Sequence, residues 1–352
     1  MAESVDATDL KSVQAHPWCQ FKSGSGQTFK GSRLRAFSLV RLDNPMAKND
    51  KIEELSELVL KDSTNFQARR ELVVELMQKG FNEEALKHLY ILLKTFPEDS
   101  RLHYNAAIVL ENLKKYDKAI ISYKNALKLQ PEEPDFIYNL GYAYLQTGEL
   151  DTALPYFKKV LEIEPEDANS YFNMGYIFSK KQEHELAYKC MERALLLNKE
   201  DHLACFYLAY EASQLGDDEK AVKLYEKVLQ MRPDYSWAYF NLAAIYFKQG
   251  QTEQAFEYLK KTLEFNPKDN DAALVFAKML AQNNKPQEAA RLLENALKNN
   301  PYDGNLHYVL ARVYKEAGNI ELYALHLQEA VKNPDNLPFD VKFVQKELDK
   351  LN

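Results

Sequence analysis

The chain has 352 residues, of which 46% are hydrophobic and only 11 are Gly, and this apolar content suffices for a substantial buried core. The formal net charge of −7 argues against a nucleic-acid backbone as the main partner. No apolar run approaches the roughly 18 residues of a membrane-spanning helix, so we expect no membrane insertion. The three cysteines, Cys19, Cys190 and Cys205, show no paired spacing and indicate reduced thiols in a cytoplasmic protein.

Residues 1–45 differ from the rest of the chain because they show neither a helical period nor a repeat. Composition alone favours a disordered extension. Back-translation adds a sharper hypothesis, because residues 2–7, 9–12 and 20–23 can be encoded by stretches that resemble, in order, the D-arm, anticodon stem-loop and T-arm of a leucine tRNA gene. We therefore expect residues 1–45 to be read-through of such a gene rather than native coding sequence, with Met46 as the true start and a bacterial source.

Residues 46–65 predict an N-terminal capping helix, because Ile52, Leu55 and Val59 recur at helical spacing. Beyond this segment, one sequence position, called the slot from here on, recurs every 34 residues. It is filled by Pro97, Pro131, Pro165, Lys199, Pro233, Pro267 and Pro301. A fixed period of this length predicts an array of similar supersecondary units rather than a domain built around one central core.

Three further rows keep the same register. Ala stands twelve residues before every slot, from Ala85 to Ala289, and small residues such as Gly141 form a second row, which marks close approach of two antiparallel helices. A third row predicts the turn between these helices, where left-handed backbone favours Gly. It contains Gly80, Lys114, Gly148, Gln182, Gly216, Gly250, Asn284 and Gly318.

The stretches Tyr138-Asn139-Leu140-Gly141 and 153–157 (Ala-Leu-Pro-Tyr-Phe) resemble the tetratricopeptide repeat (TPR) consensus closely. The resemblance covers residues 66–337 as eight units of 34 residues. It implies an all-α, right-handed superhelical TPR solenoid of helix-turn-helix repeats. Residues 338–352 predict a C-terminal capping helix, because Phe343, Val344 and Leu348 lie on one apolar stripe.

The same resemblance implies that the first helix of each pair lines a concave groove where partners bind. Three rows and one Trp are then candidate contacts with a peptide: an aromatic row, an Asn row whose amides could hold an extended backbone, and a Tyr row that departs from the consensus. These candidates are Tyr104, Tyr138, Phe172, Phe206, Phe240; Asn105, Asn139, Asn173, Tyr207, Asn241; Tyr142, Tyr176, Tyr210; and Trp237. The alternative is that these rows only pack the repeats together.

The sequence shows no motif for a nucleophile, a phosphate loop or a metal, so we expect no enzyme activity and no cofactor. The predicted function is a non-catalytic protein–protein interaction scaffold that binds a peptide segment or helix of a partner in its concave groove. The alternative is a structural assembly protein that self-associates through its terminal repeats or convex face.

Overall fold

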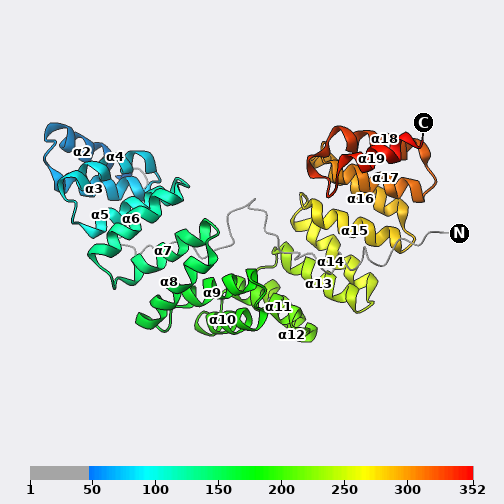
Figure 1. The fold of residues 1–352 in the computed structure, drawn as a ribbon, viewed down its shortest axis with the longest axis horizontal. Coiled ribbons are helices and arrows are strands. Elements are labelled where there is room, and N and C mark those ends of the chain that lie inside the picture. Colours follow the sequence, from blue (N-terminus) through cyan, green and yellow to red (C-terminus); the bar gives the residue numbers. More distant parts are fainter. Residues whose placement is uncertain (1–46, 352) are drawn as a thin grey trace. The chain divides into compact units, whose positions relative to one another are not determined.

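The computed structural model describes residues 47–351 (Figure 1). In this part of the chain the secondary structure is eighteen α-helices and one short 3-10 helix, without a strand, and the predicted all-α class is confirmed. No helix between residues 47 and 351 is long and apolar enough to cross a membrane. The expectation of a tRNA-derived segment at 1–45 lies outside the described residues.

The helix bounds follow the 34-residue register. They are α2 Ala47–Lys61, α3 Phe66–Gln78, α4 Asn82–Thr95, α5 Ser100–Asn112, α6 Tyr116–Leu129, α7 Pro134–Gln146, α8 Leu150–Ile163, α9 Ala168–Lys180, α10 His184–Leu197, α11 His202–Gln214, α12 Asp218–Met231, α13 Ser236–Lys248, α14 Thr252–Phe265, α15 Asn270–Gln282, α16 Pro286–Asn299, α17 Gly304–Glu316, α18 Ile320–Lys332, the 3-10 helix η1 Pro334–Asn336 and α19 Val341–Asp349.

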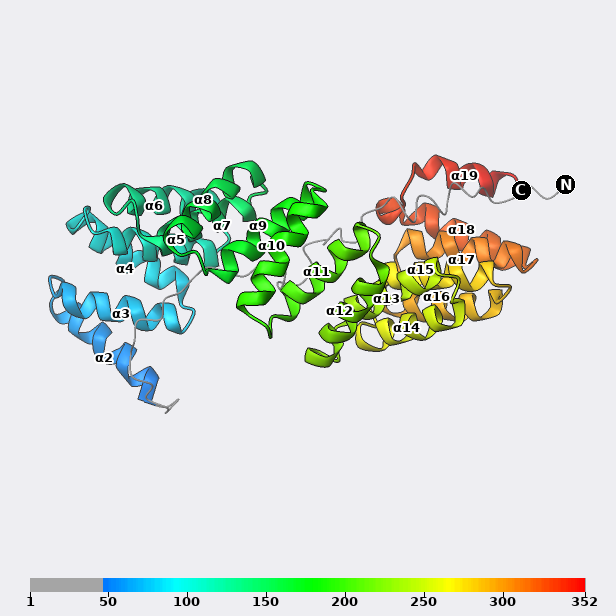
Figure 2. The same cartoon turned by 90° about the horizontal axis from the view of Figure 1, so that it is seen from below.

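Each predicted repeat is a pair of consecutive helices, from α3 with α4 to α17 with α18, with α2 before the first pair and α19 after the last (Figures 1 and 2). The predicted array of about eight helix-turn-helix repeats with a helix at each end is therefore confirmed for the described residues. The chain divides into two compact units: helices α2–α9 belong to the first, and nearly all of α10 belongs to the second with α11–α19.

The turn inside every repeat has a left-handed residue. The five glycines of the predicted turn row have φ between +76° and +87°, and Lys114, Gln182 and Asn284 adopt φ of 60°, 60° and 57°. Left-handed backbone closes the first helix and lets the chain reverse into the second within three residues. The turn row was thus predicted correctly, including the three positions where Gly is absent.

The core of each repeat forms where small and large side chains alternate. All seven Ala of the row from Ala85 to Ala289 are completely buried, which lets the two helices of a pair approach closely. Tyr123, Phe157 and Tyr225 are also fully buried and fill the space that remains. At Gly141 an added Cβ would lie 2.9 Å from Tyr156 Cβ, so this contact admits no side chain.

Five of the seven loops between repeats start the next first helix with an Asp two residues after the slot, whereas Glu133 and Tyr235 at this position provide no side-chain cap. Asp99, Asp167, Asp201, Asp269 and Asp303 each accept a hydrogen bond from a backbone N–H in the first turn of the following helix. Such N-caps satisfy donors that have no partner inside the helix. In these five loops the slot residue and its Asp together mark where one repeat ends and the next one begins.

Candidate functional site

The predicted binding residues lie on first helices of the repeats: on α5, α7 and α9 in the first unit, and on α11 and α13 in the second. Five of them are half-buried, namely Tyr104, Asn105, Tyr142, Trp237 and Asn241. The other nine are buried: Tyr138, Asn139, Phe172, Asn173, Tyr176, Phe206, Tyr207, Tyr210 and Phe240. Burial thus divides the set into side chains that retain surface and side chains packed within the repeats.

Two predicted Asn residues connect successive repeats of the first unit. Asn139 Nδ2 donates to Tyr104 Oη at 2.6 Å, and Asn173 Nδ2 donates to Tyr138 Oη at 2.9 Å. Both Asn side chains are completely buried, so these bonds satisfy donors that cannot reach water. Asn139 and Asn173 therefore hold α5, α7 and α9 together and leave no surface for direct contact with a partner.

In the second unit, Asn241 is oriented differently. Thirty-five residues before it, where the two first-unit pairs have Tyr, stands Phe206, which has no hydroxyl to accept a hydrogen bond. Asn241 Nδ2 instead donates to the carbonyl of Trp237, one turn earlier on the same helix, at 2.8 Å. The amide is only half-buried, so Asn241 retains surface that the first-unit Asn residues lack.

Tyr104 belongs to an aromatic cluster at the junction of two repeats. Its ring stacks on Phe136 with centroids 4.6 Å apart and contacts Tyr123 at 5.8 Å. Burial raises the pKa of Tyr104, with a further contribution from the Asp135 carboxylate, so its hydroxyl stays protonated. Phe136 was not among the predicted residues, although it stands where the neighbouring repeats have Leu102 and Ser170 and is conspicuous for its size.

The row of three Tyr residues that departs from the consensus differs in exposure. Tyr142 on α7 is half-buried, whereas Tyr176 on α9 and Tyr210 on α11 are 5% and 8% exposed. Burial and then the Glu111 carboxylate raise the pKa of Tyr142, which keeps the phenol neutral and able to donate a hydrogen bond. Lys180 Nζ lies 5.4 Å from the centre of the Tyr176 ring. Tyr142 is therefore the member of the row with the most surface.

Buried carboxylates on first helices, among them Glu111 and Glu211, were not predicted. Glu111, 7% exposed, accepts a hydrogen bond from Tyr123 Oη at 3.0 Å in the first unit. Glu211, completely buried in the second unit, lies 2.8 Å from His184 Nδ1. Each acid interrupts an otherwise apolar stretch, and this interruption is the sequence signal that could have identified them.

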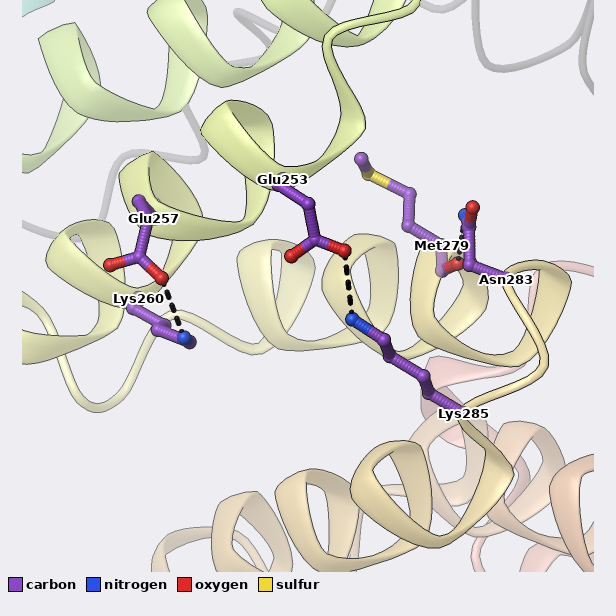
Figure 3. Close-up of polar contacts among 6 residues, drawn as sticks. All are labelled: Glu253, Glu257, Lys260, Met279, Asn283 and Lys285. Carbon is purple, nitrogen blue, oxygen red and sulfur yellow. Dashed lines mark hydrogen bonds and ion pairs between the residues drawn. The ribbon is translucent and has the colours of Figure 1, made fainter.

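Charged side chains on the surface join one helix pair to the next. In Figure 3, Lys285, in the turn before α16, reaches back to Glu253 at the start of α14, with 2.9 Å between Nζ and Oε1. Beside it, Asn283 Nδ2 donates to the carbonyl of Met279 at 2.8 Å. Equivalent ion pairs are Asp151 with Lys181 at 2.8 Å and Asp218 with Lys248 at 2.7 Å. Exposed pairs of this kind contribute about 0–1 kcal/mol each to the free energy of unfolding.

Five family profiles match the sequence. Tetratricopeptide repeat profiles match residues 134–167, 156–189 and 280–321, and a TPR repeat profile matches 112–148. The profile of anaphase-promoting complex, cyclosome, subunit 3 matches residues 214–296. Fold and sequence together define a solenoid of tetratricopeptide repeats. A search of curated proteins found no match.

Solved structures with similar folds include three TPR proteins. MamA is 26% identical, with a TM-score of 0.45, over 50% of this chain and 96% of its own. Cut9, in the APC/C hetero-tetramer Cut9–Hcn1, is 17% identical, with a TM-score of 0.53, over 76% of this chain and 52% of its own. PilF of Pseudomonas aeruginosa is 21% identical, with a TM-score of 0.50, over 61% and 97%. Cut9 and PilF support the assignment of the fold.

Proposed function

We propose that this chain is a non-catalytic scaffold that captures a peptide segment or helix of a partner protein in a concave groove lined by the first helices of its repeats. The observation that carries the proposal is the set of half-buried aromatic and amide side chains on these helices. Aromatic side chains supply rigid apolar contact, and amides supply a donor and an acceptor for a peptide backbone. Cut9, whose fold is similar, is found in a complex with another protein chain, Hcn1.

Burial reduces the set of residues that we propose to contact a partner. We retain Tyr104, Asn105 and Tyr142 for the first unit and Trp237 and Asn241 for the second, because these side chains keep part of their surface. Tyr142 is the best single test of the first unit. Its ring departs from the repeat consensus, and it stays half-buried where Tyr176 and Tyr210 are buried.

The experiment compares wild type with Tyr142→Ala and Trp237→Ala, each used to capture partners from the native host for quantitative mass spectrometry. Aromatic anchors of interfaces commonly contribute about 2 kcal/mol or more, so affinity for a peptide from the recovered partner should fall at least about tenfold. Far-ultraviolet circular dichroism of each variant should match that of wild type.

Tyr90→Ala is the matched control. Tyr90 is 51% exposed and lies on α4, the second helix of its pair, so its removal should leave capture unchanged. Equal peptide affinity for wild type, Tyr142→Ala and Trp237→Ala would refute the assignment to the first helices.

Self-assembly is a second candidate function, favoured by exposed apolar side chains at both ends of the array. At the N-terminal end, Leu58 and Leu60 on α2 are 40% and 83% exposed. At the C-terminal end, Phe339 and Phe343 are 37% and 51% exposed. Capping helices of repeat arrays normally present a polar outer face, so apolar side chains here indicate contact with another protein surface.

A further inference from the structure

We infer that copies of this chain associate head to tail, with the outer face of α2 of one copy on the outer face of α19 of the next. This inference rests on the second proposed function, self-assembly, and specifies its surfaces. Apolar and charged side chains on the two faces are complementary.

The head surface is the outer face of α2, defined by Glu53, Glu54, Glu57, Leu58 and Leu60. Leu55 and Val59 are buried against the first repeat, so helical spacing places these five side chains on the opposite side and its two flanks. All five are exposed. The surface therefore presents two apolar side chains among three carboxylates.

Two lysines of α2 do not neutralise the carboxylates of the head surface. Lys51 Nζ lies 2.6 Å from Glu75 Oε1 on α3, so its charge is directed toward the first repeat. Lys61 lies 3.8 Å from Glu57 and offsets one carboxylate. Glu53 and Glu54 form no ion pair with a described residue.

The tail surface is the outer face of α19 and the residues that flank it, defined by Phe339, Lys342, Phe343, Lys346 and Lys350. Val344 and Leu348 are buried against the last repeat, and helical spacing places Phe343, Lys346 and Lys350 on the opposite side. The Phe339 and Phe343 rings lie 5.4 Å apart and form one exposed aromatic patch. Three lysines border this patch.

The acidic residues of the same segment have partners of their own within α19 or in the last repeat. Asp340 caps α19 by accepting from the backbone N–H of Lys342 at 2.9 Å, and Glu347 lies 3.7 Å from Arg312. Asp349 accepts from Gln345 Nε2 at 2.7 Å. The three lysines form no ion pair with any described residue, so their charges remain available to the carboxylates of a head surface.

A second copy of the chain fits this pair of surfaces better than an unrelated partner. Each surface supplies the charge that the other lacks, and both contain exposed apolar side chains that association would remove from water. Contact between two different surfaces leaves one head and one tail free, so further copies can add in series.

One helix face on each side buries less than the roughly 1,600 Å² of a standard interface. We therefore expect weak association, with a dissociation constant on the order of micromolar or higher. Exposed charges are screened by salt, so association should weaken as ionic strength rises.

Sedimentation velocity on the full chain tests the inference. Wild type should increase in average mass with concentration. A head variant, Leu58→Asp with Leu60→Asp, and a tail variant, Phe343→Asp with Lys346→Glu, should each remain monomeric. Mixed together, they should form a 1:1 dimer of twice the monomer mass and nothing larger, because only one intact head and one intact tail remain.

Ile121→Asp is the control, because Ile121 is 61% exposed on α6, away from both ends, and its variant should assemble like wild type. Wild type that stays monomeric at every concentration would refute both self-assembly and the head-to-tail contact. Concentration-dependent mass that both variants retain would leave self-assembly standing and refute the contact between α2 and α19. A monomeric mixture of the two variants would refute that contact as well.

Discussion

Single residues at the turns show how strictly the repeat constrains its backbone. Eight turns use a left-handed residue, but three of them lack Gly. A non-Gly residue in this conformation is disfavoured by about 1–2 kcal/mol, and Gly at a fixed position loses about 0.5–1 kcal/mol in chain entropy. The difference leaves Lys114 and Gln182 less stable than Gly would be, whereas Asn tolerates this backbone better.

We therefore predict that Lys114→Gly and Gln182→Gly each raise the free energy of unfolding by about 0.5–1 kcal/mol. Asn284→Gly should change it less. Lys115→Gly is the matched control and should give no gain, because Lys115 has an ordinary φ of −92°. Urea denaturation measures all four variants, and the idea fails if the first two are no more stable than wild type.

We predict that His326 in the last repeat and His88 in the first make the free energy of unfolding depend on pH. His326 Nδ1 lies 2.9 Å from His307 Nδ1, and its ring stacks on Tyr314. Burial and then His307 lower the pKa of His326, although Glu294 and Glu329 act in the opposite direction.

The pKa of His88, which lies beside Arg69 in the first repeat, is also lowered. Its Nδ1 lies 2.9 Å from Arg69 Nη1, and burial followed by the Arg69 charge lowers its pKa.

The direction of this pH dependence follows from which state of the chain binds more protons. Below the unfolded pKa of 6.5 the unfolded chain binds protons that the folded chain does not, because the folded pKa values are lower. Stability should therefore be constant above about pH 7 and fall as pH decreases from about 6.5 towards 5. Urea midpoints across this range should show the decrease. A double variant, His88→Gln with His326→Gln, should show a smaller one, and an equal decrease in both proteins would contradict this explanation.

At the scale of elements, hydrogen bonds between first helices join one repeat to the next. The bond from Asn173 on α9 to Tyr138 on α7 is buried, and the loss of either side chain removes a buried hydrogen bond. Tyr138→Phe and Asn173→Ala should each lower the free energy of unfolding by about 1–3 kcal/mol. The double variant should lose less than the sum of the two, because both remove the same bond.

Tyr90→Phe is the control for this cycle. Its hydroxyl is on an exposed ring, so the change should stay within about 0.5 kcal/mol. Strictly additive losses in the Tyr138 and Asn173 variants would show that the bond does not couple α7 to α9.

Sequence alone could predict features that each repeat contains within itself. Ala153 at a close helix approach, Gly148 at a turn and Asp167 after the slot each have a local physical cause, and most repeats have the same residue at the equivalent position. The role of Asn173 could not be read in this way, because its partner lies 35 residues earlier on another helix. The sequence suggests that this Asn row binds a peptide backbone. The hydrogen bond from Asn173 to Tyr138 is evident only in the structure, where α7 and α9 pack together.

At the scale of the whole molecule, the regular register does not mark every structural division. The chain separates into two compact units within the repeat of α9 and α10, and the row of slots shows there only the replacement of Pro by Lys199. The ends were easier to predict, since α2 and α19 each have one apolar stripe. Their outer faces were not anticipated, because a stripe indicates what is buried and not which of the remaining side chains gather on the opposite side.

Open space around the turns has a practical consequence. A Cβ added at Gly80, Gly148, Gly216, Gly250 or Gly318 would have no other atom within 4 Å, and Lys114 shows that the turn accepts a long side chain. A Cys introduced at two such turns could carry a donor and an acceptor fluorophore without disturbing the core. The periodic turns thus provide an internal ruler, with marks one repeat apart, for following in solution how the spacing of repeats changes when a ligand binds.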